Sequence, residues 1–150
     1  MEKYKKNCDT KSFEKKLFPE QDFTEYNYAI QYEKKAILSF QNEFRLQSID
    51  DYFTSIQLLS NSILLKKFSY RAKESVCSYY ELYLKDVISE TDFEIIEKIR
   101  EKRNEIHYDG YRASINTEEE ILKYVNFSKN IIKKLKNVYE GKKWLQIFYH

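Results

Sequence analysis

Glycine and proline are scarce in this chain. Its 150 residues include two glycines and one proline, and neither residue type occurs between Pro19 and Gly110. Because glycine and proline most often interrupt regular structure, a stretch of this length without them favours long helices. The stretch also contains no glycine-rich phosphate loop and no nucleophile elbow, two common signatures of nucleotide-binding and hydrolase folds.

Cysteine and histidine are equally rare, with two of each. Cys8 and Cys77 lie far apart in the chain and do not have the spacing of metal ligands. We therefore expect neither a zinc site nor a disulfide framework. Cys77 is expected to be a small buried apolar residue, Cys8 to have no special role, and both thiols to stay reduced. We expect no cofactor.

Long apolar runs and an excess of one charge are also missing. No run approaches the roughly 18 residues of a membrane span, and the charged N-terminal segment lacks the apolar stretch of a secretory signal. We therefore expect no membrane contact and a cytoplasmic location. The 26 basic and 24 acidic side chains leave a net charge of +2. This balance argues against a positive coat for non-specific nucleic-acid binding but leaves room for a local basic groove.

Apolar residues recur at helical spacing along most of the chain. They step by three, four and seven residues, which keeps one face of each helix apolar. The first of five such stripes comprises Phe23, Tyr26, Ile30, Ile37, Phe40 and Phe44, and the last comprises Ile121, Val125, Ile132, Leu135 and Tyr139. The pattern predicts helices over residues 22–46, 49–67, 70–86, 91–108 and 117–139. Short connections make neighbouring helices antiparallel, so we predict an all-α, up-and-down bundle of about five helices.

Three positions carry the signature of a helix start, a capping residue followed three positions later by an acid. They are Ser48 with Asp51, Thr91 with Glu94 and Thr117 with Glu120. Gly110 predicts the end of the fourth helix. We expect residues 1–20 to form a charged, weakly ordered arm and residues 21–150 to form a single domain. The aromatic tail KKWLQIFYH is expected to dock on the bundle.

The fourth predicted helix carries four polar side chains along one edge of its apolar face. With about 100° per residue and Ile95 at zero, the apolar face centres at about 50°. The charged residues on the opposite face are expected to point to solvent, and they are Glu97, Lys98, Glu101 and Glu105. Arg103 falls at about 80°, inside the apolar arc. It is followed by His107 at about 120°, Arg100 at about 140° and Asn104 at about 180°.

Two interpretations of this strip are open. Basic residues in a last turn complement the helix dipole, and an arginine can extend its charged group past apolar neighbours to water. However, a guanidinium turned toward a core is costly unless it is paired. Arginine forks match phosphate oxygens, and an imidazole exchanges protons near neutral pH. Guanidinium, amide and imidazole groups on one strip therefore suit a phosphodiester.

The segment RNEIHYDG, preceded by IIEKIR, resembles the signature helix of the HEPN superfamily (higher eukaryotes and prokaryotes nucleotide-binding). The motif of that superfamily is an arginine, often followed by a polar residue such as asparagine, then four to six residues and a histidine. The upstream segment YFTSIQLLSNSILLKKFSYRAKESVCSYYELYL resembles the paired core helices that precede the motif in many prokaryotic members. The likeness covers about residues 22–140 and implies a HEPN-like helical bundle.

The resemblance implies a metal-independent ribonuclease. Many members of the superfamily are toxins paired with a small nucleotidyltransferase antitoxin, and they dimerise so that two motifs line one cleft. By this resemblance, His107 would act as general base or acid on the ribose 2′-hydroxyl or the leaving oxygen. Arg100 and Arg103 would stabilise charge on the phosphate, and Asn104 would orient the scissile group.

The spacing of the motif leaves two alignments. Three residues separate Arg103 from His107, one fewer than in the family pattern. Either Arg100 is the motif arginine, or Arg103 is and Tyr108 takes the position of the histidine. Tyrosine, with a reference pKa of about 10, is a poor proton shuttle at neutral pH, so the second alignment predicts weak or absent activity. In some toxin pairs of this superfamily the antitoxin adds AMP to a tyrosine beside the motif, for which Tyr108 or Tyr111 would be the candidate.

Three functions therefore stay open. The first is a homodimeric ribonuclease that is the toxin of a two-component module. The second is a HEPN-type module with little or no catalytic activity, which binds a nucleotide, RNA or a nucleotidyltransferase partner. The third is a helical interaction protein in which Arg100 and Arg103 both form ion pairs with acids of their own chain.

Overall fold

The structure is a computed structural model that describes residues 7–109 and 117–141. Its elements in chain order are a 3-10 turn (Thr10–Ser12), β1 (Phe13–Lys15), α2 (Gln21–Gln41), α3 (Arg45–Phe68), β2 (Tyr70–Ala72), α4 (Ser75–Leu84), α5 (Glu90–Asp109) and α6 (Glu118–Tyr139). The predicted all-α bundle is confirmed, and the two short strands are the only departure from it in the described part of the chain. None of the described helices is both long and apolar enough to span a bilayer.

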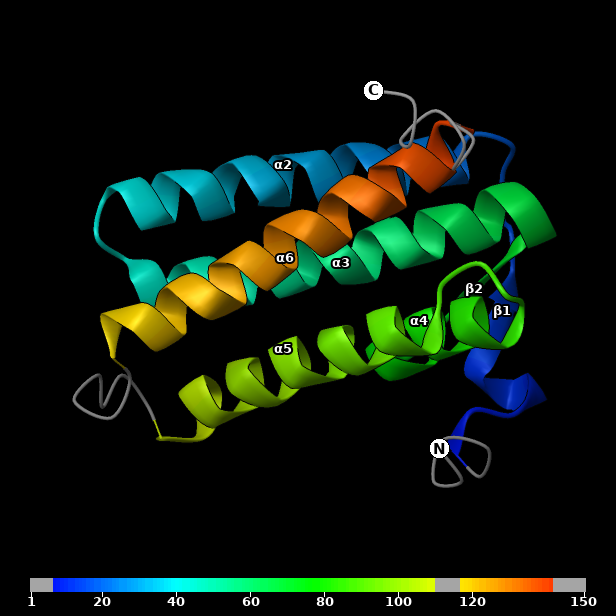
Figure 1. Ribbon diagram of the computed structural model, residues 1–150. Helices are drawn as coiled ribbons and strands as arrows, with labels where there is room; N and C mark the ends of the chain where they lie inside the picture. Colours follow the sequence, from blue (N-terminus) through cyan, green and yellow to red (C-terminus); the bar gives the residue numbers. More distant parts are fainter. Residues whose placement is uncertain (1–6, 110–116, 142–150) are drawn as a thin grey trace, which may run out of the picture.

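Helix α3 lies in the middle of the bundle, in contact with every other helix (Figure 1). The four long helices alternate in direction along the chain. Arg45 at the start of α3 pairs with Glu118 at the start of α6, and Lys66 near the end of α3 binds the backbone of Tyr139 at the end of α6. Helices α3 and α6 are therefore parallel, while α2 and α5 run the opposite way on either side of α3 (Figure 1).

Helix α2 packs on α3 through small residues. Ala29 and Ala36 have no exposed surface, and the carbonyl oxygen of Ala29 accepts a hydrogen bond of 2.8 Å from the buried Ser55 hydroxyl of α3. The apolar stripe predicted for this helix is buried only in part, because Tyr26 and Phe40 pack against the core while other members of the stripe do not. Phe23 remains 56% exposed and Ile37 40% exposed. Two alanines give a shorter distance between helices than large side chains do, so α2 turns its alanines inward and leaves several larger apolar residues outside.

Only one of the three predicted helix caps is confirmed. The Thr117 hydroxyl accepts a hydrogen bond of 3.1 Å from the backbone N–H of Glu120 at the start of α6. The predicted cap at Ser48 is wrong, because α3 already begins at Arg45 and Ser48 is buried within its first turn. The predicted cap at Thr91 is also wrong. Ser89 takes that role and accepts a hydrogen bond of 3.0 Å from the N–H of Asp92.

The N-terminal segment, which the sequence predicts to be a charged arm, carries a 3-10 turn and strand β1 within its described residues. Strand β1 pairs antiparallel with β2, with Phe13 opposite Ala72. The side chain of buried Asn61 on α3 exchanges two hydrogen bonds with the backbone of Ala72, at 2.9 and 3.3 Å. The predicted helix over residues 70–86 therefore begins only at Ser75, because its first residues form this strand. Gly110 and the tail after Gly141 lie outside the described residues.

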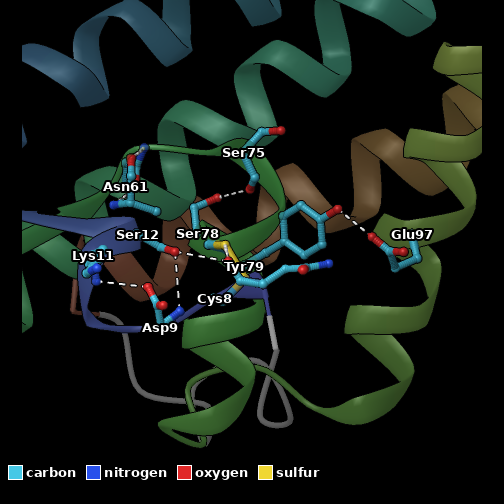
Figure 2. Close-up of a disulfide and its surroundings, with 12 residues drawn as sticks. Cys8, Asp9, Lys11, Ser12, Asn61, Ser75, Ser78, Tyr79 and Glu97 are labelled. Atoms are coloured by element: carbon cyan, nitrogen blue, oxygen red, sulfur yellow. Dashed lines mark hydrogen bonds between the residues drawn. A yellow bond between two sulfur atoms is a disulfide. The ribbon is translucent and has the colours of Figure 1, made fainter. Parts of the chain in front are cut away.

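Cys8 and Cys77 form a disulfide bond, so the expectation of two unpaired thiols is wrong (Figure 2). Their Cα atoms are 5.5 Å apart although the residues are separated by 69 positions in the sequence. The pairing of β1 with β2 places the N-terminal segment beside the start of α4 and so brings the two cysteines together. The prediction failed because the spacing of two cysteines along a chain says nothing about a contact that a distant strand pair creates.

Candidate functional site at the end of helix α5

The C-terminal half of α5 packs on the N-terminal half of α3. Ile99 and Ile106 of α5 are buried, with exposed fractions of 0% and 5%. Between them, Arg103 is half-buried at the edge of this apolar face, where the helical wheel predicts it. The antiparallel packing places the predicted motif against the first three turns of α3, which the sequence alone did not connect with it.

Arg103 reaches the core, and no acid of the described residues pairs with it. Its guanidinium carbon lies 4.7 Å from the centre of the Phe53 ring on α3, within the distance at which a cation is attracted to an aromatic face. The Nε atom of Arg103 is buried and has no hydrogen-bond partner among the described residues, and none of the ion pairs found within residues 7–109 and 117–141 includes Arg103. Within the described residues, the Nε donor of Arg103 therefore has no acceptor.

His107 lies one turn beyond Arg103 and contacts the same helix. Its Nε2 atom is 3.1 Å from an Oδ1 atom of Asp50, which makes an ion pair when the imidazole is protonated. The His107 side chain is 51% exposed and that of Asp50 is 23% exposed. Because Asp50 and Phe53 are three residues apart, they occupy the same face of α3. Arg103 and His107 therefore form one site against that face.

Arg100 differs from Arg103 because it has an acidic partner within α5. It forms a two-pronged ion pair with Glu97, at 3.0 and 3.2 Å. The hydroxyl group of buried Tyr79 donates a hydrogen bond to the same carboxylate (Figure 2). The prediction that Glu97 faces solvent is wrong, since its side chain is only 13% exposed. A purely structural role predicts that both arginines pair with acids of their own chain. Arg100 does so, whereas Arg103 has no acidic partner among residues 7–109 and 117–141.

The remaining predicted residues face outward or fall outside the described chain. Asn104 is exposed on the turn that separates Arg103 from His107. Tyr108 is 94% exposed and, unlike His107, makes no contact with α3 among the interactions of the described residues. Tyr111 lies outside the described residues. Arg103 and His107 both contact α3, a combination that matches neither alignment of the motif, since the first pairs His107 with Arg100 and the second pairs Arg103 with Tyr108.

Sequence reasoning missed three residues beside the motif. Asp50 and Phe53 hold His107 and Arg103, and Lys102 is 4% exposed although it is charged. Lys102 binds Glu120 of α6 at 3.0 Å and lies over the Tyr124 ring. Burial raises the pKa of the Tyr124 phenol, which keeps it neutral beside this lysine. In the sequence, Asp50 could not be distinguished from the acids that are common in the first turn of a helix.

No protein-family model matches the chain, and no curated protein is significantly similar to it. Within residues 7–109 and 117–141, no three His, Cys, Asp or Glu side chains are grouped so that they could hold a metal ion. The chemistry of the site therefore has to be inferred from Asp50, Phe53, Arg103 and His107 themselves.

Proposed function

We propose that the protein is a metal-independent endoribonuclease whose active site comprises Arg103 and His107, with Asp50 as a positioning residue. The observation that carries the proposal is the pairing of these groups. The Arg103 guanidinium, which has no acidic partner in the described part of the chain, lies one turn from a half-exposed imidazole that contacts a carboxylate. Arginine binds phosphate oxygens through its fork of N–H donors, and an imidazole held by a carboxylate is a suitable proton-transfer group.

The proposed reaction is attack of a ribose 2′-oxygen on the adjacent phosphorus. The ring nitrogen of His107 that faces away from Asp50 takes the 2′-hydroxyl proton, and the bond from phosphorus to the 5′-oxygen breaks. The leaving 5′-oxygen takes a proton from a water molecule, and the proton held on His107 neutralises the resulting hydroxide, which gives a 2′,3′-cyclic phosphate and a 5′-hydroxyl end. Arg103 stabilises the negative charge on the phosphate oxygens during this step. Asn104, exposed on the same turn, orients the scissile group.

The resemblance to HEPN toxins extends the proposal to partners. The protein would act in the cytoplasm, as the toxin of a module with a nucleotidyltransferase antitoxin. Tyr108 supports this part, because a side chain that is 94% exposed beside the site is accessible to an enzyme that transfers AMP. A reducing cytoplasm would keep Cys8 and Cys77 as thiols. Activity should therefore be measured with the disulfide formed and with it reduced.

The decisive experiment compares RNA cleavage by the wild type and by His107→Ala, Arg103→Ala and Asp50→Asn. Each of the first two substitutions is expected to lower the rate at least about 100-fold, and Asp50→Asn is expected to shift the pH profile because it changes the partner of the imidazole. Lys98→Ala, an exposed cation on the opposite side of α5, is the control and should leave the rate unchanged. Equal cleavage by wild type and His107→Ala would exclude this active site.

A second candidate is a HEPN-type module that binds the phosphates of RNA or a nucleotide without cleaving them. The capture of Arg100 by Glu97 favours it, because only one of the two arginines of the motif is then available for transition-state charge. This candidate predicts no cleavage at any pH and the loss of RNA binding in Arg103→Ala. A filter-binding measurement on the same variants separates it from the ribonuclease.

A further inference from the structure

The outer side of helix α2 carries an apolar stripe with no partner in the described chain. Phe23, Ile30 and Ile37 follow one another at intervals of seven residues, which places them within about 40° of one another on the helix. Phe23 is 56% exposed and Ile37 is 40% exposed, while Ile30 is half-buried. Leu38, 57% exposed, lies beside the stripe. Figure 1 shows α2 along one side of the bundle, with α3 and α6 next to it.

The stripe is not needed for packing within the bundle. Helix α2 buries only Gln21, Ala29 and Ala36, and the two alanines contact α3. A seven-residue apolar repeat is the pattern by which a helix packs along a second helix. Since α3 already packs on the alanine face of α2, the apolar repeat is available for a helix from another molecule.

The exposed apolar surface is large enough to contribute to a dimer. A phenylalanine side chain offers about 200 Å², and exposed fractions of 56% for Phe23 and 68% for Phe44 leave roughly 250 Å² for these two residues. With Ile37 and Leu38, the surface reaches on the order of 400 Å². That is about half of the area that one partner buries in a standard interface, and it equals the largest patches that monomers expose.

The arrangement of the stripe is symmetric about Ile30. Phe23 and Ile37 lie seven residues on either side of it, and exposed apolar residues follow near both ends of α2. These are Leu17 and Phe18 at one end, 76% and 45% exposed, and Phe44 at the other. A surface with this symmetry is complementary to itself when a second copy is rotated by a two-fold axis through Ile30. Phe23 of one copy then meets Ile37 of the other.

Charge agrees with this antiparallel arrangement. Lys34 is the exposed cation closest to the stripe. An axis through Ile30 places it opposite the uncharged Asn27 of the other copy and keeps the two Lys34 residues about 12 Å apart along the helices. A parallel arrangement would put the two lysines side by side, at an energetic cost.

We infer that α2 is a homodimer interface in which the Phe23–Ile30–Ile37 stripes of two copies pack antiparallel. This interface is separate from the end of α5, so it goes beyond the proposed ribonuclease and does not depend on it. Helices α2 and α5 lie on either side of α3 (Figure 1). The α2 interface therefore does not bring the two His107 residues together.

The first test is the oligomeric state of the full-length chain, measured by size-exclusion chromatography with light scattering. The wild type is expected to be a dimer, and Ile37→Glu is expected to be a monomer with an unchanged far-UV circular dichroism spectrum. Leu122→Glu on α6 is the matched control, because Leu122 is 41% exposed and Ile37 is 40% exposed. It should stay dimeric. A monomeric wild type, as expected if the chain's own residues 142–150 cover the stripe, would overturn the inference, and so would a dimeric Ile37→Glu.

Cross-linking between introduced cysteines tests the antiparallel direction. With a reagent that spans about 10 Å, the distance between packed helices, Ile30→Cys is expected to link the two copies. Phe23→Cys is expected not to, because its two copies lie about 21 Å apart along antiparallel helices. Linking of Phe23→Cys would indicate a parallel dimer and contradict the inference. Linking of Tyr108→Cys instead of Ile30→Cys would place the interface at α5, as the HEPN resemblance implies, and would also contradict it. RNA cleavage is measured in a separate assay, so a protein that does not cleave RNA would still show by cross-linking whether the α2 dimer forms.

Discussion

Breaking the Cys8–Cys77 disulfide is expected to lower the free energy of unfolding by about 2–4 kcal/mol. The bond closes a loop across 69 positions of the sequence. In the chain-entropy description, cross-linking a loop of that length removes about 4 kcal/mol of conformational freedom from the unfolded chain. Small domains are stable by only about 5–15 kcal/mol in total, so the effect is a large fraction of the stability.

The contacts that hold the N-terminal segment set the lower end of this range. If the N-terminal segment detached as soon as the disulfide broke, the folded state would gain conformational entropy as well, and the loss of stability would be small. Arg71 opposes detachment, because it pairs with Glu14 of β1 at 2.9 Å and with Glu25 of α2 at 2.7 Å. Asn61 also holds the backbone of Ala72 in β2. We therefore expect the segment to stay in place and most of the entropic effect to be measurable.

The assay is urea unfolding followed by far-UV circular dichroism on oxidised wild type, reduced wild type and Cys8→Ser. Cys8 is the better position to substitute because Cys77 is only 1% exposed. Reduced wild type and Cys8→Ser should unfold at the same, lower midpoint, and reductant should not affect Cys8→Ser. A loss below about 1 kcal/mol would refute the reasoning about the closed loop. Two free thiols in the oxidised, denatured protein would refute the bond itself.

Three further predictions concern single contacts. Burial alone would raise the pKa of the Asp22 carboxyl, but hydrogen bonds donated by Lys16 and Tyr139 lower it below 3.8. These contacts therefore stabilise the fold above pH 3.8 and are lost as the pH falls below it, so Asp22→Asn should reduce stability at pH 7 and flatten the loss in acid. Thr117→Ala removes the cap of α6 and should cost about 1 kcal/mol in urea unfolding. Ala36→Leu inserts a larger side chain between α2 and α3 and should cost about 1–3 kcal/mol.

Each of these predictions has a control or a contradicting result. Thr91→Ala should change stability little, because Thr91 is exposed and does not cap α5; an effect equal to that of Thr117→Ala would remove the distinction between the two positions. Gln31→Leu adds a leucine to the exposed side of α2 and should be close to neutral, in contrast to Ala36→Leu. If Asp22→Asn and the wild type had the same stability at every pH between 7 and 2, the contacts of Asp22 with Lys16 and Tyr139 would not contribute to the free energy of unfolding.

Prediction from sequence succeeded where one element determines the outcome. The apolar stripe from Ile121 to Tyr139 is the buried face of α6, and Thr117 caps it, because both features depend only on residues of the helix and its first turn. Arg103 lies at the edge of the apolar face for the same reason. Prediction failed for α2, whose larger apolar residues outweighed Ala29 and Ala36 in the pattern although the alanines allow the closer approach to α3.

The candidate site shows the same division. The spacing of Arg103 and His107 on one helix predicts that they lie close together. Their partners Asp50 and Phe53 come from α3, and a pattern within one helix does not predict contacts with another helix. The two alignments of the motif were equally compatible with the sequence. Only packing against α3 distinguishes His107, which contacts Asp50, from Tyr108, which is exposed.

By itself, the sequence determined that the chain is a helical bundle and which residues of α5 form a polar strip, because helical periodicity and the absence of glycine and proline are local properties. The tertiary structure alone decided that Cys8 meets Cys77, that Tyr79 binds the Glu97 carboxylate that pairs with Arg100, and that Asp50 faces His107. The physical reason is that burial, pairing and the choice of a packing face depend on residues from other parts of the chain. Their positions are known only when all the helices are in place.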